Sequence, residues 1–285
     1  RPGHRRMIGF GFGIRRAAIT ARRAPLDALA ASIRAAYGLR RLVSSWTGPL
    51  ITVRRSSDGA SLDISAGADG WLDMAALIAF VGTASAFITK WWDQSGNGCH
   101  AVQSTAAAQP RIVNAGVVDL IGGRPSLSLD GNRWMLSSVP AVAQPFSVVT
   151  VIQQADYSTG VNNRLFHSTS SNFIAGSGSN GTVIAYAGSY LESTPLTDGA
   201  AYGVAGIYNG ASSHVRTNGL VATGDTGSGQ LDAAVNLFTT GVSGTGTGIK
   251  FTGNCSDLVF LGAALTTSAS AGLISSLGLG RGISA

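Results

Sequence analysis

The feature that most constrains the fold is a succession of short apolar segments separated by turn residues. From Arg111 onward, segments such as PRIVNAG, FSVVTVIQQ and VNLFTTGV are each bounded by Gly, Asn, Asp or Pro. Short runs of β-branched and aromatic residues between turn signals are typical of strands, and their spacing favours a two-sheet sandwich. FSVVTVIQQ and SDLVFLGAAL are the most apolar of these runs, so we expect them at the centre. The pattern predicts an all-β fold.

The first hundred residues mix helical and strand patterns. LDALAASIRAAYGLRRL carries apolar residues at helical spacing and predicts a helix that ends at or beyond Gly38. LITVRRSSDGASLDI predicts a β-hairpin, and AFITKWW predicts a strand. LDMAALIAFVG predicts a short helix capped near Asp69 or Asp73, and TTSASAGLISSLGLGRG predicts a short helix that closes the domain.

Basic residues are concentrated at the N-terminus. Residues 1–57 hold twelve Arg and a single acid, Asp27, whereas the rest of the chain is mildly acidic. Residues 1–25 contain seven Arg and no acid, with Gly alternating with Phe and Ile. Such a segment cannot bury enough apolar surface to order alone. We therefore expect an extended N-terminal arm of residues 1–25, followed by one sandwich domain of residues 26–285.

Three roles fit this arm: docking on a neighbouring subunit, contact with nucleic acid, or a disordered tail. The residues expected to anchor the arm contribute either the positive charge of Arg or the apolar ring of Phe. They are Arg5, Arg6, Phe10, Phe12, Arg15, Arg16, Arg22 and Arg23.

The stretch WWDQSGNG, residues 91–98, is the first candidate for a ligand site. Neighbouring strand residues point to opposite faces, so at most one of Trp91 and Trp92 faces the core. An outward tryptophan beside the Asp93 carboxylate would offer a platform for a sugar. The alternative is that Asp93 caps a tight loop, because Asp, Asn and Gly all favour turns.

Two tyrosines and the one glutamate are further candidates for binding and catalysis. Tyr186 and Tyr190 lie among Gly and Ser residues, which suits glycan contact, although ordinary strand aromatics would look the same. Glu192 is the one glutamate, and it could form a hydrolase pair with Asp156 or Asp198.

The two cysteines and the histidines suggest no reactive centre. Cys99 and Cys255 are expected to be free buried thiols, with a long-range bridge between sheets as the alternative. Cys99 and His100 are adjacent, so their side chains would point apart. We assign no catalytic residue, no metal ligand and no cofactor. Calcium bound by Asp and Asn loop oxygens stays open, although no EF-type spacing is present. No apolar run approaches the roughly 20 residues of a membrane span, so no membrane insertion is expected.

An ordered set of motifs in residues 35–131 carries a family resemblance. They are AAYGLRRL, TGPLITVRRSSDGASLDI, DGWLDMAALIAFV, WWDQSGNGCHAVQ, and QPRIVNAG followed by GGRPSLSLDG. This set resembles the N-terminal half of the arabinofuranosidase B catalytic-domain family. It is also similar to the concanavalin A-like, or laminin G-like, domains of phage and prophage virion proteins. The resemblance implies a two-sheet jelly-roll sandwich of the concanavalin A-like type with a few short helices.

The resemblance leaves three functions to weigh. The family's enzymes use a carboxylate pair, but the pair lies beyond the shared motifs, so no catalytic residue carries over. The virion members favour a non-enzymatic phage structural protein, such as a tail fibre, tail-tip component or head decoration. The alternatives are a glycoside hydrolase of arabinofuranosidase type and a free carbohydrate-binding module.

The phage hypothesis carries its own expectations about partners and location. The arm would bind other virion proteins, the sandwich would contact host-surface glycan, and the protein would form a homo-oligomer, with a trimer suited to a fibre. We read no secretory signal in the N-terminal segment. The expected location is therefore the virion, with synthesis in the host cytoplasm and exposure to the outside as part of the particle.

Overall fold

The computed structural model describes residues 23–157, 163–168, 173–175, 181–239 and 251–283. The elements up to residue 130 are η1 (Asp27–Ser32), β1 (Ile33–Gly38), β2 (Ile51–Arg55), β3 (Ser61–Ile64), α1 (Met74–Val81), β4 (Ala86–Trp91), β5 (Ala101–Val102), η2 (Ala106–Ala108), β6 (Arg111–Asn114), β7 (Val117–Val118), β8 (Leu120–Ile121), β9 (Arg124–Pro125) and β10 (Leu127–Asp130). Those that follow are β11 (Met135–Ser137), β12 (Phe146–Gln153), β13 (Phe166–Ser168), β14 (Phe173–Ala175), β15 (Ile184–Tyr186), β16 (Tyr190–Glu192), β17 (Ala201–Tyr208), β18 (Ser213–Thr217), β19 (Leu220–Gly224), β20 (Val235–Leu237), β21 (Thr252–Leu261) and α2 (Thr267–Gly278).

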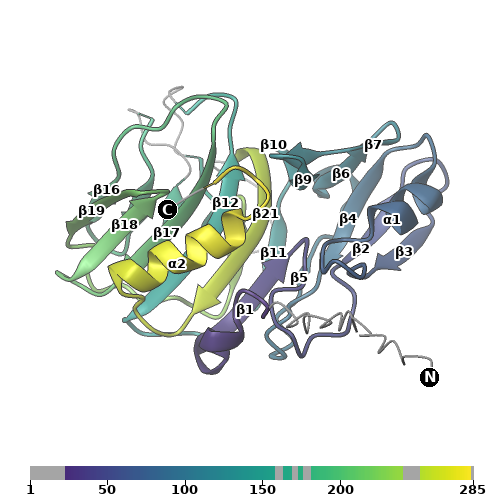
Figure 1. The fold of residues 1–285 in the computed structure, drawn as a ribbon. Coiled ribbons are helices and arrows are strands. Elements are labelled where there is room, and N and C mark those ends of the chain that lie inside the picture. Colours follow the sequence, from purple (N-terminus) through teal and green to yellow (C-terminus); the bar gives the residue numbers. More distant parts are fainter. Residues whose placement is uncertain (1–22, 158–162, 169–172, 176–180, 240–250, 284–285) are drawn as a thin grey trace, which may run out of the picture.

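The chain folds as a β-sandwich with few helices, as the strand pattern predicts. One layer holds β21, β12, β17, β18 and β19 side by side, with β1 also paired to β21 (Figure 1). The other layer runs β3-β2-β4-β5-β11-β20-β13. Strands β6 and β10 connect β4 to β21, so the hydrogen-bonded path continues from one layer into the other.

Strands β12 and β21 lie at the centre of the first layer, which confirms the expectation from their apolar sequences. They pair with each other, and β12 also pairs with β17 along its whole length. Val148 and Ile152 of β12 face the main core, whereas Val149 and Val151 face a second core on the other side. A strand buried on both faces reads as a continuous apolar run rather than as an alternating one.

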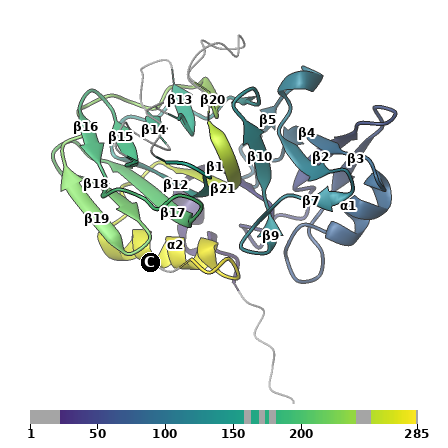
Figure 2. The same cartoon turned by 90° about the horizontal axis from the view of Figure 1, so that it is seen from above.

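Helix α2 covers the outer face of this layer, as Figure 2 shows from above. Thr266 caps its N-terminus by accepting a hydrogen bond from the Ala269 amide. The helix buries Leu273, Ile274 and Leu277 against β12 and β17 in the second core. The predicted C-terminal helix is therefore confirmed.

The helix predicted from Leu26 to Gly38 is wrong beyond its first turns. Residues 27–32 form the 3₁₀ helix η1, and residues 33–38 form strand β1, in which Ala36 pairs with Val259 of β21. Ala35 and Tyr37 face the main core, and Ala36 faces the second core. Pairing with the central strand buries both faces of the segment, and this tertiary gain exceeds the small helical preference of its alanines.

The other local predictions for the N-terminal half are confirmed. Strands β2 and β3 form the predicted hairpin, and helix α1 begins after Asp73, whose carboxylate accepts a hydrogen bond from the Ala76 amide. The AFITKWW segment contains strand β4. Cys99 and Cys255 are free and buried, and burial raises the pKa of these thiols to about 11 and about 12.

The predicted arm cannot be compared with the structure in the same way. Residues 1–22 lie outside the described residues, so Arg5, Arg6, Phe10, Phe12, Arg15, Arg16 and Arg22 do too, while Arg23 is exposed.

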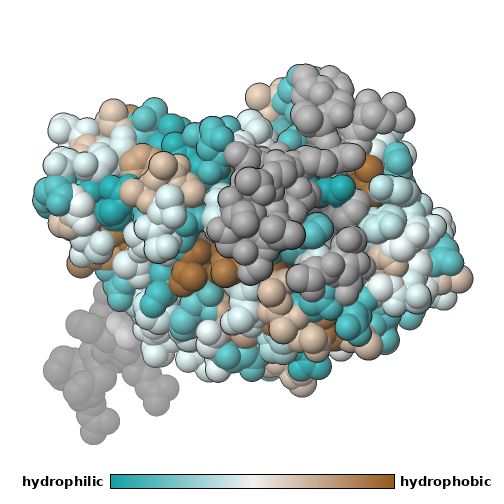
Figure 3. Space-filling model, turned by 180° about the vertical axis from the view of Figure 1, so that it is seen from behind, coloured by the Kyte–Doolittle hydropathy of each residue, from teal (hydrophilic) through white to brown (hydrophobic). Residues whose placement is uncertain are grey.

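On the face that Figure 3 shows, hydrophobic residues form small separate patches outside the part that grey atoms cover. Large exposed apolar patches mark docking surfaces, and the visible part of this face offers none of that kind.

Candidate functional site

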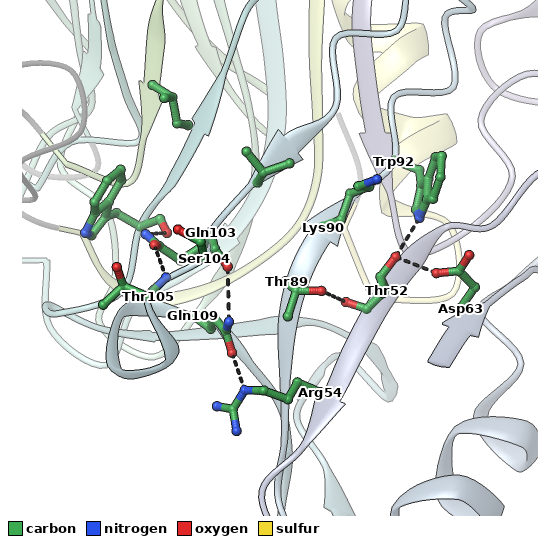
Figure 4. Close-up of a pocket in the computed structure, with 13 residues that line it drawn as sticks. Thr52, Arg54, Asp63, Thr89, Lys90, Trp92, Gln103, Ser104, Thr105 and Gln109 are labelled. Atoms are coloured by element: carbon green, nitrogen blue, oxygen red, sulfur yellow. Dashed lines mark hydrogen bonds between the residues drawn. The ribbon is translucent and has the colours of Figure 1, made fainter. Parts of the chain in front are cut away.

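A groove with a volume of about 820 Å³ lies on the outward face of the second layer (Figure 4). Its walls combine charged, amide, hydroxyl and aromatic side chains. They are Thr52, Arg54, Asp63, Thr89, Lys90, Trp92, Val102, Gln103, Ser104, Thr105, Gln109, Trp134 and Leu136. A concave site with aromatic walls and a few fixed polar groups is the usual form of a site for a small organic ligand.

The register of the strands explains why these residues meet. Asp63 of β3 pairs with Thr52 of β2, Thr52 with Lys90 of β4, Lys90 with Val102 of β5, and Val102 with Leu136 of β11. Directly paired residues lie on the same face of a sheet, and their chain neighbours lie on the opposite face. The adjacent row is formed by Ile64, Ile51, Trp91 and Ala101, all of which are buried in the core.

Trp92 is fixed at one end of the groove by three neighbours. Its Nε1 donates a hydrogen bond to Thr52 Oγ1 at 3.0 Å, and Thr52 Oγ1 donates to Asp63 Oδ1 at 2.5 Å. Lys90 Nζ lies 4.3 Å from the Trp92 ring centroid, and the His100 ring centroid lies 4.6 Å from it. The indole, the hydroxyl and the carboxylate are therefore held in place before any ligand binds.

The opposite wall is held by a chain of amide groups. Arg54 Nε donates to Gln109 Oε1, and Gln109 Nε2 donates to the Gln103 carbonyl. Gln103 Nε2 in turn donates to the Trp134 carbonyl at 3.0 Å, while its Oε1 accepts from the Thr105 amide. These bonds tie the β5–β6 connection to the segment before β11 and place Trp134 at the edge of the groove.

The predicted pair of tryptophans divides between core and groove, as expected from their positions. Trp91 is fully buried and packs on Tyr37, whereas Trp92 lines the groove. Asp93 does not line it. Its carboxylate is fully buried and accepts hydrogen bonds from the amides of Ala36, Ser95 and Cys99 and from the Ser95 hydroxyl. Asp93 therefore has the loop-capping role rather than an open position for a sugar.

The predicted tyrosines do come together, but on another sheet. Tyr186 of β15 and Tyr190 of β16 are paired in register, and their ring centroids lie 4.7 Å apart. Tyr190 is 60% exposed. Neither tyrosine lines the groove, so the glycan contact predicted for this pair stays a prediction.

The other candidates for chemistry have separate structural partners. Glu192 accepts a hydrogen bond from the Thr182 hydroxyl, and Asp198 accepts one from the Tyr157 amide. His100 Nδ1 accepts a hydrogen bond from the Asp93 amide, and the His100 ring lies against Trp92. Burial lowers the pKa of His100, an effect that Lys90 reinforces and Asp93 opposes.

A second hollow lies near the basic residues Arg23, Arg40 and Arg41, next to Trp71. The guanidinium groups of Arg40, Arg124 and Arg281 all lie within 5.0 Å of the Trp71 ring centroid. Arg281 Nη1 also forms a 2.9 Å ion pair with the buried Asp257 of β21. These contacts fix the C-terminal segment to the central strand, which is a structural role.

Groups of metal-ligating residues and long apolar helices can be assessed over residues 23–157, 163–168, 173–175, 181–239 and 251–283. Within those ranges no three His, Cys, Asp or Glu residues are grouped so as to hold a metal ion. Among the same residues no helix has the length and apolarity to cross a membrane. The expectation about calcium stays a prediction.

Several groove residues escaped the sequence analysis, above all Thr52, Asp63, Gln103 and Trp134. The alternation in the LITVRRSSDGASLDI hairpin does place Thr52 and Asp63 on its outward side. The contribution of β5 and β11 could not be read in the same way, because their pairing joins segments distant in the sequence.

Comparisons with known proteins connect this chain to arabinofuranosidases. A family model described as alpha-L-arabinofuranosidase B, catalytic, matches residues 27–123. An alpha-L-arabinofuranosidase of Hypocrea jecorina is 45% identical over 65 residues, which is 23% of this chain and 13% of that protein. A probable alpha-L-arabinofuranosidase B of Aspergillus fumigatus is 44% identical over 66 residues, again 23% of this chain and 13% of the relative. The aligned segment is thus a small part of these relatives.

Solved structures show the same relationship at the level of fold. An arabinofuranosidase complexed with arabinofuranosyl-α-1,2-xylobiose has a TM-score of 0.64 and 15% identity, and the match covers 92% of this chain and 66% of that one. A GH54 α-L-arabinofuranosidase soaked with a cyclic sulfate inhibitor has a TM-score of 0.61 and 17% identity, over 89% of this chain and 65% of that one. At these identities the likeness establishes the fold alone.

These findings correct the hypothesis of a phage virion protein. The family match agrees with the arabinofuranosidase part of the predicted resemblance and contradicts its virion part. The expected roles as tail fibre, tail-tip component or capsid decoration, and the expected virion location, are contradicted by relatives that are named enzymes of Hypocrea and Aspergillus. The expectation of a non-enzymatic protein is contradicted by the same relatives, which are named as arabinofuranosidases. The physical reason for the error is that a low-charge sandwich rich in Gly, Ser and Thr serves both classes of protein equally well.

Proposed function

We propose that this chain is a glycoside hydrolase domain of the α-L-arabinofuranosidase type, and that the groove beside Trp92 binds its arabinofuranosyl ligand. One observation carries the proposal. All but two of the residues that line the groove, the exceptions being Trp134 and Leu136, lie within the segment that matches the arabinofuranosidase B catalytic model. The part of the chain with family likeness is thus the part that builds the groove.

The chemistry of the groove suits a sugar. Trp92 and Trp134 supply aromatic walls, and Arg54, Lys90 and Asp63 supply charged groups that can bond hydroxyls. Asp63 is the carboxylate of the groove, and Thr52 orients it. A carboxyl group in that position can act as the general acid or base of glycoside hydrolysis.

A second candidate function is glycan binding without hydrolysis. Retaining and inverting glycosidases use two carboxyl groups, roughly 5–10 Å apart across the scissile bond. All fourteen acidic residues of the sequence lie in the described part of the chain, and Asp63 is the single one among the lining residues. This observation favours binding alone, and the assay below separates the two functions.

The test is release of 4-nitrophenol from 4-nitrophenyl α-L-arabinofuranoside, with ligand binding measured in parallel by calorimetry. We expect hydrolysis by the wild type and a fall in kcat/KM of about 100-fold or more in Asp63→Asn, the scale of general acid–base catalysis. Glu192→Gln is the matched control, because Glu192 is also an exposed carboxylate bonded to a threonine hydroxyl but lies outside the groove. It should keep wild-type activity.

The outcomes distinguish the alternatives. Binding without any hydrolysis would overturn the hydrolase and leave the glycan-binding domain. Full activity in Asp63→Asn, or its loss in Glu192→Gln, would overturn the assignment of the groove as the reaction site.

Three expectations from the sequence enter as further parts of this proposal. We infer jelly-roll connectivity of the concanavalin A-like type, which the pairing of β1 with the late strand β21 supports. We keep the division into an arm of residues 1–25 and a domain of residues 26–285. We also keep a homo-oligomer as the expected assembly, which sedimentation of the purified chain tests directly.

A further inference from the structure

The row of residues that forms the floor of the groove does not end at Leu136. Leu136 of β11 pairs with Asn236 of β20, and Asn236 pairs with His167 of β13. A single in-register row therefore crosses the layer from strand to strand, starting at Asp63 and continuing through Thr52, Lys90, Val102, Leu136, Asn236 and His167. With about 4.8 Å between neighbouring strands, the row extends over roughly 29 Å.

The whole row points away from the core. The residues that precede or follow its far members, among them Phe166, Val235 and Leu237, belong to the main core. Val102 is 41% exposed, and Leu136 and His167 are half-buried, whereas Asn236 is largely buried. The row thus has polar groups at both ends and an apolar stretch in the middle.

The small sheet of β14, β15 and β16 continues this layer beyond β13. Strand β14 lies beside β13, and Figure 2 shows β16, β15, β14, β13 and β20 following one another along the same side. Ala185 and Leu191, the chain neighbours of Tyr186 and Tyr190, face the main core. The two tyrosines therefore point outward, as His167 does.

Arg164 connects the end of the row to the tyrosine pair. Burial lowers the pKa of Arg164 to about 10, and Tyr190, Tyr208 and Tyr186 all oppose this lowering. Burial lowers the pKa of His167, and the charge of the Arg164 guanidinium lowers it further. The lowered pKa favours the neutral imidazole, which offers one donor and one acceptor to a ligand hydroxyl.

We propose that this outward face, from Asp63 and Trp92 through Leu136 and His167 to the Tyr186–Tyr190 pair, binds one extended polysaccharide chain that runs across the strands. The inference rests on the proposed function, because it makes the groove one end of a longer site. A ligand of several sugar residues matches its length, whereas a single arabinofuranosyl group occupies the groove alone. Its polar groups at both ends and the apolar stretch of Val102 and Leu136 between them suit an uncharged chain with hydroxyl edges and apolar ring faces.

The first experiment varies the length of the ligand. The probes are α-1,5-linked arabino-oligosaccharides of two to six residues, and binding is read by stopped-flow tryptophan fluorescence, because Trp92 and Trp134 lie in the groove. Reading within milliseconds precedes hydrolysis. We expect the affinity to rise at least about tenfold from the disaccharide to the hexasaccharide, the effect of one further aromatic contact. Equal affinities would overturn the extended site and leave the groove, whereas no binding at any length would overturn the proposed function as well.

The second experiment removes the far end of the site. Tyr190→Ala should lower the affinity for the hexasaccharide about tenfold and leave that for the disaccharide unchanged. Leu220→Ala is the matched control, because Leu220 is 56% exposed on the edge strand β19, comparable with the 60% of Tyr190, and lies off the row. An equal loss for both ligands in Tyr190→Ala, or an equal loss in the control, would overturn the inference.

Discussion

The two layers of the sandwich are covered differently. The layer of β12, β17 and β21 is buried on both faces, by the main core on one side and by α2 on the other. The layer of β2, β4 and β5 is buried on one face, and its other face carries the groove. The difference teaches that the doubly covered layer supplies stability, whereas the singly covered layer has side chains free to be selected for a ligand.

The largest expected effect is a loss of stability in the doubly covered layer. Phe260 of β21 is fully buried and packs edge-on against Tyr37 and Phe166. Phe260→Ala should lower the free energy of unfolding by about 3–5 kcal/mol, because it removes the ring and leaves a cavity. Urea unfolding followed by fluorescence measures it. A change below about 1 kcal/mol would contradict the claim that β21 is the centre of the core.

A pair of glycine substitutions sharpens the same comparison. A Cβ on Gly203 of β17 would lie 2.4 Å from Ile274 Cγ2 of α2, whereas a Cβ on Gly272 of α2 would meet nothing within 4 Å. Gly203→Ala should destabilise by about 1–3 kcal/mol through overpacking. Gly272→Ala should stabilise by up to about 1 kcal/mol through helix propensity. Changes of opposite sign in the free energy of unfolding, measured with urea, would confirm that α2 packs closely on β17. Equal changes in the two variants would contradict it.

In the singly covered layer, the expected effect falls on binding. Trp92→Ala should weaken the binding of an arabino-oligosaccharide by about tenfold, since an aromatic wall is lost. Its cost in unfolding free energy should be smaller than that of Phe260→Ala, because Trp92 is half-buried. The control is Trp46→Ala, another half-buried tryptophan, whose Nε1 donates to the Pro49 carbonyl outside the groove. Calorimetric binding that is unchanged in Trp92→Ala would exclude the groove as the site.

The smallest expected effect is a pH dependence from beneath α2. Burial, followed by the charge of Arg216, lowers the pKa of His214 from its ordinary value of 6.5. The unfolded state then takes up the proton more readily than the folded one. Stability from this residue is therefore complete above pH 6.5 and is lost as the pH falls below it. Unfolding free energies measured from pH 7.5 to 5 should decline less steeply in His214→Gln than in the wild type. An equally steep decline in His214→Gln and in the wild type would show that His214 does not contribute to the pH dependence of stability.

Apart from residues 33–38, local patterns could predict which segments become strands and helices, but not which strands meet. The alternation around Thr52 and the turn residues of WWDQSGNG are local, so the hairpin, the strand β4 and the loop held by Asp93 follow from them. The groove needs β5 and β11 beside β4, and nothing near Val102 or Leu136 in the sequence specifies that pairing. The predicted sugar contact at Asp93 illustrates the limit, because turn chemistry and sugar binding use the same residue types.

By itself, the sequence determined an all-β sandwich, the central place of the two most apolar strands, the capped helix α1 and the closing helix α2. Each follows from apolar periodicity and from turn or cap residues within a few positions of one another. The tertiary structure alone decided that residues 33–38 form a strand rather than a helix, and that residues from five strands line one groove. Ala36 and Val259 are more than two hundred positions apart. The free energy of burying a strand between two cores depends on such distant partners, which no local pattern records.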